Sequence, residues 1–301
     1  MALYQSVTGF IDRHFDDQSK AWLRARWVAL RSRATPALRA WYGTFDADAL
    51  ERHLAQTLGS DWDILFVHSS MNGLQPAFTG TALDLVKMLI RFVGPERTLA
   101  MPAFYFGDPE IGGAGQTFAV RPRFDLRRTP SQMGLPSELF RRSRGVVQSL
   151  NPIYRVSALG PRAAELVAGH ELAPTLRGAG TPFDVMARAN ALIIGLGKPF
   201  EVLTQVHHPE DVLGDAFPVP LSVSDPLPMV LLDGAQEIPY RLPRSGLKWR
   251  RDMWRLRRIM PPAQLREWRF HGVPMFATRA GDVSRSITEA AARGETIYVR
   301  P

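Results

Sequence analysis

Asp63-Ile-Leu-Phe-Val-His68 is a short apolar run of the kind that forms a buried strand, and it leads into a small polar loop, Ser69-Ser-Met-Asn-Gly73. A capping-box pattern at Thr81-Ala-Leu-Asp84 then starts a segment with apolar residues at helical spacing, which Gly94-Pro95 ends. Thr98-Leu-Ala-Met-Pro-Ala-Phe104 is the next apolar run. This strand–helix–strand order predicts a right-handed crossover in a largely parallel sheet. Proteins of this class place ligands in the loops where such strands end.

Patterns further along the chain add a strand, a hairpin and two helices. Ala191-Leu-Ile-Ile-Gly-Leu-Gly197 has the composition of another buried strand. Asp233-Gly234 lies between two strand-like runs, which is a strong signal for a β-hairpin. The basic segment 247–260 is predicted to be helical, and a last helix is expected at about 284–293. The sequence therefore predicts an α/β protein with a largely parallel central sheet and a β-hairpin elaboration.

The composition of the chain limits its class. It has 301 residues, of which 45% are hydrophobic, and it contains no cysteine, which excludes a disulfide scaffold, cysteine-ligated zinc and a thiol nucleophile. No apolar run approaches the roughly 20 residues of a membrane span. The first residues lack an apolar signal core. We expect a cytoplasmic protein without a transmembrane segment, in which residues 1–60 form a basic helical extension packed on a main domain at 61–301.

The positive charge is concentrated rather than spread. The formal net charge is +8, and basic side chains crowd Lys20–Arg39 and again Lys248–Arg258. Such a field favours anionic partners, such as a phosphorylated cofactor, nucleic acid, an acidic glycan or a membrane surface. Because no nucleic-acid-binding motif is recognisable, we expect no nucleic-acid partner. Weak contact with a membrane surface stays open, and so does a basic surface with no specific partner.

A polar stretch that follows the 191–197 run carries the strongest chemical signal. Gln205-Val-His-His-Pro-Glu-Asp211 places two imidazoles and two carboxylates within five consecutive positions. If the stretch is helical, His207 and Glu210 lie three residues apart on one face, where the carboxylate can orient the ring and stabilise it when it takes a proton. A solvated polar turn and a metal site are the alternatives, although no His-Glu-x-x-His pattern is present and we expect no metal.

The serines that follow the first strand invite a hydrolase hypothesis. Ser69 or Ser70 could act as a nucleophile with His207 and Glu210, but the chain has no G-x-S-x-G motif. No Walker A motif and no G-x-G-x-x-G motif occurs either. Two serines in such a loop more often cap backbone groups or bind a ligand.

Taken together, these stretches resemble the aminoglycoside N3-acetyltransferase family, the acetyl-CoA-dependent enzymes of the antibiotic-NAT type. The resemblance covers about residues 60–215, and its specificity lies in the order of the matching pieces. Those pieces are Asp63–Ser70, Thr98–Phe104, Phe124-Asp125, Thr129–Gly134, Glu138–Arg142, Ser149–Pro152, Gly160, Gly180–Phe183 and Thr204–Glu210.

The resemblance implies a three-layer α/β/α fold that binds acetyl-CoA and transfers its acetyl group directly to an amine. His207 would be the general base and Glu210 its partner. The cofactor would lie against two loops, represented by Ser69, Ser70 and Met71 and by Ser131, Met133 and Gly134. Tyr105, Asp125 and Asn151 are assigned to the acceptor amine.

The chain departs from the family at three places. The family usually has His-Pro where this chain has Asn151-Pro152, and a small hydroxyl residue near the position of Arg155. Pro209 lies inside the His-x-x-Glu pattern, and a proline in the middle of a helix removes a backbone hydrogen bond. His207 and Glu210 are therefore expected in the first turn of a helix or at a kink.

The charge expected around the acceptor-binding site limits the class of amine that the protein would acetylate. Aminoglycosides are polycations, whereas the segments expected to line that site are basic, and long-range repulsion would slow capture of such a substrate. The basic residues in question are Arg241, Arg244, Lys248, Arg250 and Arg251. We therefore expect an N-acetyltransferase acting on an amino sugar or on a nucleotide-linked or glycan-linked amine. An aminoglycoside 3-N-acetyltransferase, a Ser/His/Glu hydrolase and a non-catalytic module that binds anionic polymers are the alternatives.

Overall fold

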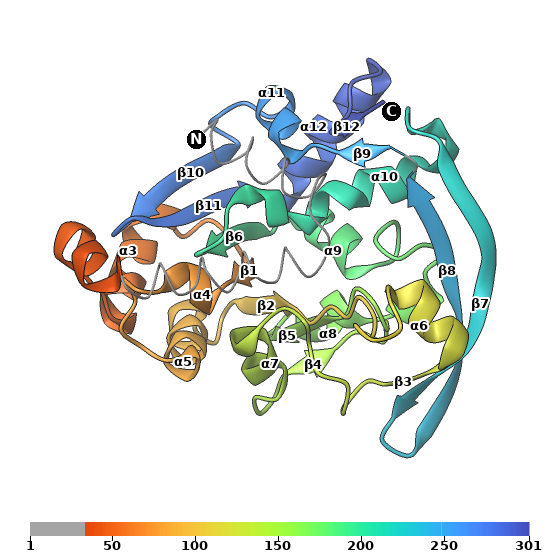
Figure 1. The fold of residues 1–301 in the computed structure, drawn as a ribbon, viewed down its shortest axis with the longest axis horizontal. Coiled ribbons are helices and arrows are strands. Elements are labelled where there is room, and N and C mark those ends of the chain that lie inside the picture. The colour runs from red at the N-terminus through yellow and green to blue at the C-terminus, as the bar shows by residue number, and fades with distance from the viewer. Residues whose placement is uncertain (1–33, 248, 301) are drawn as a thin grey trace. The chain divides into compact units, whose positions relative to one another are not determined.

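The computed structural model describes residues 34–247 and 249–300 (Figure 1). The chain clusters into two compact units, Met1–Thr44 and Phe45–Pro301, and residues 34–42 of the first are helical. The second unit begins with α3 (Ala47–Leu58), whose leucines at 50, 54 and 58 are buried. Most of the expected extension lies outside the described residues, so its packing on the main domain stays a prediction. Of the described helices, none is both long and apolar enough to cross a membrane.

A seven-stranded sheet forms the centre of the second unit. Its strands lie in the order β10-β11-β6-β1-β2-β5-β4. They span Leu265–Phe270, Val273–Arg279, Leu192–Leu196, Ile64–Ser69, Thr98–Pro102, Val156–Leu159 and Val147–Gln148. β6, β1 and β2 are parallel, as predicted, while the pairs β11–β6, β10–β11, β2–β5 and β4–β5 are antiparallel. Only β5 and β11 therefore run against the common direction.

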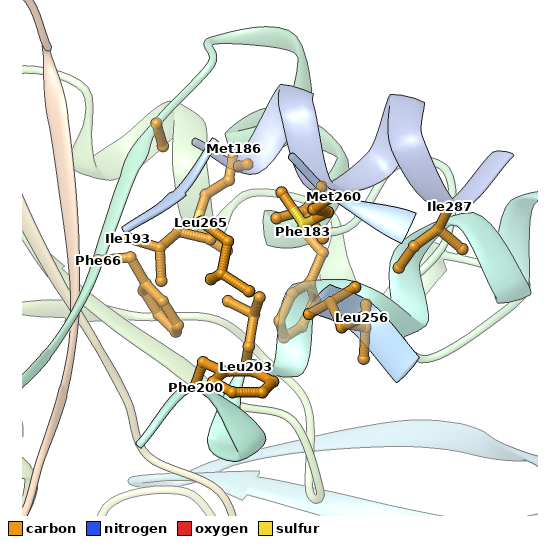
Figure 2. Close-up of a cluster of buried hydrophobic side chains, with 14 of the residues drawn as sticks. Phe66, Phe183, Met186, Ile193, Phe200, Leu203, Leu256, Met260, Leu265 and Ile287 are labelled. Carbon is orange, nitrogen blue, oxygen red and sulfur yellow. The ribbon is translucent and has the colours of Figure 1, made fainter. Parts of the chain in front are cut away.

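Alternate residues of the central strands point to two separate cores. Ile64 and Phe66 of β1 belong to one buried cluster, and Leu65 and Val67 belong to the other. The first core is covered by α8 (Ala163–Val167), α9 (Pro182–Arg188) and α12 (Ala280–Ala292), and part of it is shown in Figure 2. The second core is covered by α3, α5 (Ala82–Val93) and α7 (Leu135–Arg141). The three-layer α/β/α arrangement is thus confirmed.

A long β-hairpin lies beside the main sheet (Figure 1). β7 (Leu221–Asp233) and β8 (Gln236–Leu247) pair around the predicted Asp233-Gly234 turn, where Gly234 has a φ of +65°. β3 (Arg123–Asp125) adds a third strand to this small sheet. A third apolar cluster, which includes Leu231 and residues of α6 (Ala114–Val120), lies at its base. The predicted hairpin elaboration is confirmed.

The basic segment 247–260 is not one helix, and that prediction is wrong. β9 (Arg250–Arg251) pairs with the C-terminal strand β12 (Tyr298–Val299), and among the described residues of this segment only α11 (Leu256–Ile259) is α-helical. Pairing with a strand almost 50 residues away overrides a local helical preference, which is weak in any case. The hairpin of β10 and β11, which turns at His271-Gly272 with both φ angles positive, was also not predicted.

The loops that follow β1 and β6 touch backbone to backbone. The N–H of Ser70 donates to the carbonyl of Leu196 at 3.0 Å. Gly73 lies in the short helix α4 (Met71–Leu74), and a Cβ added to it would lie 1.8 Å from the carbonyl oxygen of Gly197. Only glycine permits this approach. It fixes the positions of the residues at the ends of the two strands.

We expect Gly73→Ala to destabilise the protein by about 1–3 kcal/mol, because a backbone segment has to move to admit the methyl group. Urea unfolding at neutral pH measures the change. Gly115→Ala is the matched control, since Gly115 lies within α6 and an added Cβ would meet nothing within 4 Å. That variant should gain about 0.5–1 kcal/mol. Equal effects of the two substitutions would contradict the close approach.

Candidate active site

A cavity of about 370 Å³ lies at the carboxyl ends of the three parallel strands. β1 contributes His68 and Ser69, β2 contributes Pro102, and Lys198 follows β6. His207 and Arg251 also line the cavity. Open α/β sheets bind ligands at this edge, so the topology itself indicates where a substrate would enter.

His207 and Glu210 form a hydrogen-bonded pair in the first turn of α10 (His207–Leu213). Nδ1 of His207 lies 2.6 Å from Oε2 of Glu210, and both residues are buried. Pro209 is the third residue of this helix, where a backbone N–H would have no partner within the helix, so it disrupts nothing. The first-turn position is confirmed. A proton on Nδ1 leaves Nε2 as the basic nitrogen.

The small sheet of β9 and β12 holds the pair from the other side. Arg251 and Tyr298 are partners in its register. The hydroxyl of Tyr298 donates to Oε1 of Glu210 at 2.9 Å, and Nη1 of Arg251 donates to Nε2 of His207 at 2.5 Å. Both nitrogens of the ring and both oxygens of the carboxylate therefore have partners (β9, β12 and α10 in Figure 1).

Burial and nearby charges fix the protonation states. Burial lowers the pKa of His207, and the cations Arg177 and Arg251 lower it further against the attraction of Glu210. Burial alone would raise the pKa of Glu210, but the interactions with His207, Arg177 and Tyr298 leave that pKa below its usual value. At neutral pH the site therefore holds a neutral imidazole beside an ionised carboxylate, which is the state that a general base needs.

Four residues that line the cavity each have one buried polar side-chain atom without a hydrogen-bond partner among the described residues. The atoms are Nε2 of His68, Oγ of Ser69, Oγ of Ser137 and Oε2 of Glu201. A buried polar atom without a partner is costly and uncommon in folded proteins. Four residues of this kind therefore surround a single cavity.

The buried histidines make stability depend on pH. Burial, together with the charge of Lys198, lowers the pKa of His68 to about 3, whereas an unfolded histidine titrates near 6.5. The unfolded chain therefore binds more protons below about pH 6.5, and the free energy of unfolding falls as the pH falls. We expect His68→Met to reduce this slope by up to about 1.4 kcal/mol per pH unit between about pH 6 and pH 4.5.

Urea unfolding of the two proteins over this pH range measures the two slopes. The comparison at about pH 8 serves as the control, because the imidazole is then neutral in both the folded and the unfolded chain. If both proteins lose stability with the same slope, His68 does not remain neutral in the folded state.

A comparison with known families finds a match over most of this chain. The sequence profile described as aminoglycoside 3-N-acetyltransferase matches residues 66–290. The chain belongs to that family. Aminoglycoside N(3)-acetyltransferase III from Salmonella sp is 30% identical over 158 residues, which are 50% of this chain and 54% of the relative. Aminoglycoside N(3)-acetyltransferase IX from Micromonospora chalcea is 27% identical over 56% of the chain and 62% of the relative.

Solved structures with a similar fold superpose on a larger part of this chain than the sequence relatives match. Aminoglycoside acetyltransferase AAC(3)-Xa superposes with a TM-score of 0.69 at 18% identity, over 87% of this chain and 99% of that one. AAC-IIIb in its binary complex with CoASH gives a TM-score of 0.67 at 20% identity, over 86% and 100% of the two chains. By sequence, the chain spans about half the length of the curated relatives named first. These structures therefore establish the fold, and the sequence profile establishes the family.

The structure brings some of the expected cofactor residues of this family member to the cavity. Ser69 and Met133 line it. Ser70 instead caps α4, where its Oγ accepts from the N–H of Gly73 at 3.1 Å, and Met71 packs against the second core. Ser131 and Gly134 shape the loop before α7. Oγ of Ser131 accepts from the N–H of Met133 at 3.1 Å, and Gly134 precedes α7 with a φ of +95°. As cofactor-binding residues all six stay predictions.

The three residues assigned to the acceptor do not line this cavity. Tyr105 packs in the hairpin cluster beside Phe124. Asp125 accepts from the N–H of Arg127 at 2.9 Å and so fixes a turn. Asn151 is buried, and its side chain accepts from the N–H of Ile153 at 2.9 Å. The side chains of Asp125 and Asn151 form internal hydrogen bonds, and the role of all three toward the acceptor stays a prediction.

Two residues beside the His207–Glu210 pair were not singled out from the sequence, in addition to the lining residues Ser137, Lys198 and Glu201. Tyr298 holds Glu210, and Arg177 forms a buried ion pair with Asp211, with Nη2 to Oδ1 at 2.7 Å. No motif surrounds either residue, so only the fold reveals them. Among the basic residues expected on the acceptor side, Arg251 lines this cavity, whereas Arg244 lines a separate hollow at the hairpin. Lys248 lies outside the described residues.

Proposed function

We propose that this protein is an acetyl-CoA-dependent N-acetyltransferase with His207 as its general base. The observation that carries the proposal is the neutral His207 ring, held by an ionised Glu210, in a cavity at the carboxyl ends of the parallel strands. Membership of the family and the CoASH complex of AAC-IIIb support the choice of cosubstrate. A cytoplasmic location belongs to the proposal, since a chain without cysteine fits a reducing compartment.

The residues of the cavity fit a thioester cosubstrate. Phe104 and Met133 give the cavity apolar walls, and Ser69 and Ser137 supply buried hydroxyls without partners. The loops that carry Ser69 and Met133 would hold acetyl-CoA, which supplies an acetyl group activated as a thioester. We assign Ser69 to donate a hydrogen bond to the acetyl carbonyl oxygen, where negative charge builds up during the reaction.

The chemistry requires a base because an amine, which is mostly protonated at neutral pH, has to lose two protons to become the nitrogen of an amide. The ammonium form loses the first proton to water, and His207 takes the second from the attacking nitrogen at Nε2, while Glu210 stabilises the resulting imidazolium through Nδ1. The nitrogen forms its bond to the acetyl carbon while the carbon–sulfur bond breaks, and the proton passes from Nε2 to the departing sulfur. A serine acyl-enzyme is not favoured, because Oγ of Ser69 makes no hydrogen bond to His207.

The acceptor is a small-molecule amine of low positive charge. Lys198 and Arg251 line the cavity, and Glu201 is its only carboxylate among the described lining residues. Burial raises the pKa of Glu201, so its negative charge is disfavoured. We therefore favour an amino sugar or a nucleotide-linked or glycan-linked amine. An aminoglycoside is the second candidate, because the named relatives act on that class according to their names.

Thermal unfolding of the protein with CoA, acetyl-CoA and longer acyl-CoAs tests the proposed cosubstrate. Acetyl-CoA should raise the unfolding midpoint, and inorganic phosphate at matched ionic strength should not reproduce the rise. Release of the CoA thiol with a panel of amines then tests the acceptor. No response to any acyl-CoA would contradict the proposed function, whereas rapid acetylation of several aminoglycosides would contradict the preferred acceptor alone.

A further inference from the structure

Arg251 is hydrogen-bonded to Nε2 of His207, the nitrogen that accepts a proton in the proposed reaction. Its Nη1 donates to Nε2 of His207 at 2.5 Å, so the basic lone pair of the ring is already used. In this arrangement His207 cannot take a proton from an amine. The guanidinium has to leave Nε2 before the base can act.

The surroundings of Arg251 permit that movement. The residue is exposed, it lies on the two-residue strand β9, and no carboxylate of the described residues forms an ion pair with it. Lys198, the other cation of the cavity, has no carboxylate partner in the described part of the chain either. A guanidinium binds a carboxylate or a phosphate through two parallel hydrogen bonds, which are stronger than one bond to a neutral imidazole.

We propose that the acceptor amine carries a phosphate or carboxylate group, and that this group draws Arg251 away from His207 and so frees Nε2. The inference rests on the proposed function. It adds that the acceptor carries a negative charge and that Arg251 recognises this charge. Arg251 is then a specificity-determining residue that couples recognition of the anion to exposure of the base. A polycationic amine would leave Arg251 on the ring and the base blocked.

Arg250 provides a matched control on the same strand. It precedes Arg251 on β9, it is exposed, and it does not line the cavity. Since successive residues of a strand point to opposite sides, its side chain is directed away from that of Arg251. Removing Arg250 changes the net charge by the same amount without touching His207.

The first test is an NMR titration of the His207 ring, assigned with His207→Asn. In the wild-type protein and in Arg250→Ala, inorganic phosphate should raise the pKa of the ring relative to chloride at matched ionic strength. In Arg251→Ala the pKa should already be higher without phosphate, and the response to phosphate should be lost. An equal phosphate response in Arg251→Ala, or no response in the wild type, would overturn the inference.

The second test compares two amines that differ by one anionic group, D-glucosamine 6-phosphate and D-glucosamine. The wild type should prefer the phosphorylated amine by about tenfold or more in kcat/KM, the size expected from one charge-assisted pair. Arg251→Ala should lose this preference by slowing on the phosphorylated amine, while Arg250→Ala keeps it. Equal use of both amines by the wild type overturns the inference and leaves the proposed function standing. If neither amine is acetylated, the proposed function fails for amino sugars, and the NMR titration still decides the role of Arg251.

Discussion

Replacing His207 with asparagine is expected to lower kcat/KM for acetyl transfer by about 10²–10⁴-fold, the usual contribution of a positioned general base. Asparagine keeps a polar group beside Glu210 but offers no nitrogen that takes a proton at neutral pH. The loss should appear in kcat, because proton removal belongs to the chemical step rather than to binding of the amine. Steady-state release of the CoA thiol with one fixed acceptor measures it.

His208 gives the matched control for this substitution. It is the neighbouring residue on α10 and is buried like His207, but its Nδ1 contacts Oγ of Ser284 at 3.0 Å and the residue does not line the cavity. His208→Asn should therefore retain nearly the wild-type kcat once its unfolding midpoint has been checked. Equal losses in the two variants would show that His207 acts only by supporting the fold of α10.

The pH dependence of kcat/KM distinguishes the proposed role of His207 from that of Glu210. Because burial and the cations Arg177 and Arg251 lower the pKa of His207, the limb of kcat/KM that reports this ring should lie below about pH 6.5. Glu210→Gln removes the charge that opposes this shift, so the limb should move to lower pH while the rate falls. Ionisation of the acceptor is common to both enzymes and cancels in the comparison. A limb that moves to higher pH would contradict the assigned electrostatics.

Local sequence patterns were sufficient to predict the elements whose contacts join residues that are close together in the sequence. The capping box of Thr81 and Asp84 starts α5 as predicted, with the N–H of Thr81 donating to Asp84 at 2.8 Å. The fully buried strands β1 and β6 follow from runs of apolar residues, which have few other stable positions. The spacing of His207 and Glu210 needed only one helical turn to become a hydrogen bond.

The remainder depends on contacts that no local pattern records. Arg251 meets Tyr298 across β9 and β12, and Tyr298 reaches Glu210 from 88 positions away in the chain. The hairpin of β10 and β11 joins the sheet through the pairing of β11 with β6, so the antiparallel direction of β11 is a property of the assembled sheet. A resemblance can indicate which segment approaches the ligand, but not which way its side chains point. The side chain of Asn151, for example, accepts two hydrogen bonds within its own turn and donates one to Tyr240, contacts that the sequence did not predict.

The second large effect is expected at the buried ion pair of Arg177 and Asp211, close to His207 and Glu210. Arg177→Met should destabilise the fold by about 3–5 kcal/mol, the cost of leaving one partner of a buried pair without its counter-charge. The Arg177 side chain is 13% exposed and that of Asp211 is 5% exposed, and Nε and Nη2 of the guanidinium bind the two carboxylate oxygens at 3.1 and 2.7 Å. Urea unfolding at neutral pH measures the loss.

Arg162→Met is the matched control, because Arg162 also forms a two-point pair, with Glu165, but the side chains are 31% and 50% exposed. Water screens that pair, so its loss should cost about 0–1 kcal/mol. The double variant Arg177→Met/Asp211→Asn removes both buried charges and should be more stable than Arg177→Met alone, since the cost lies in the unpaired carboxylate rather than in the absent attraction. If the double variant is the less stable of the two, packing of the arginine stem, and not charge, stabilises this side of the site.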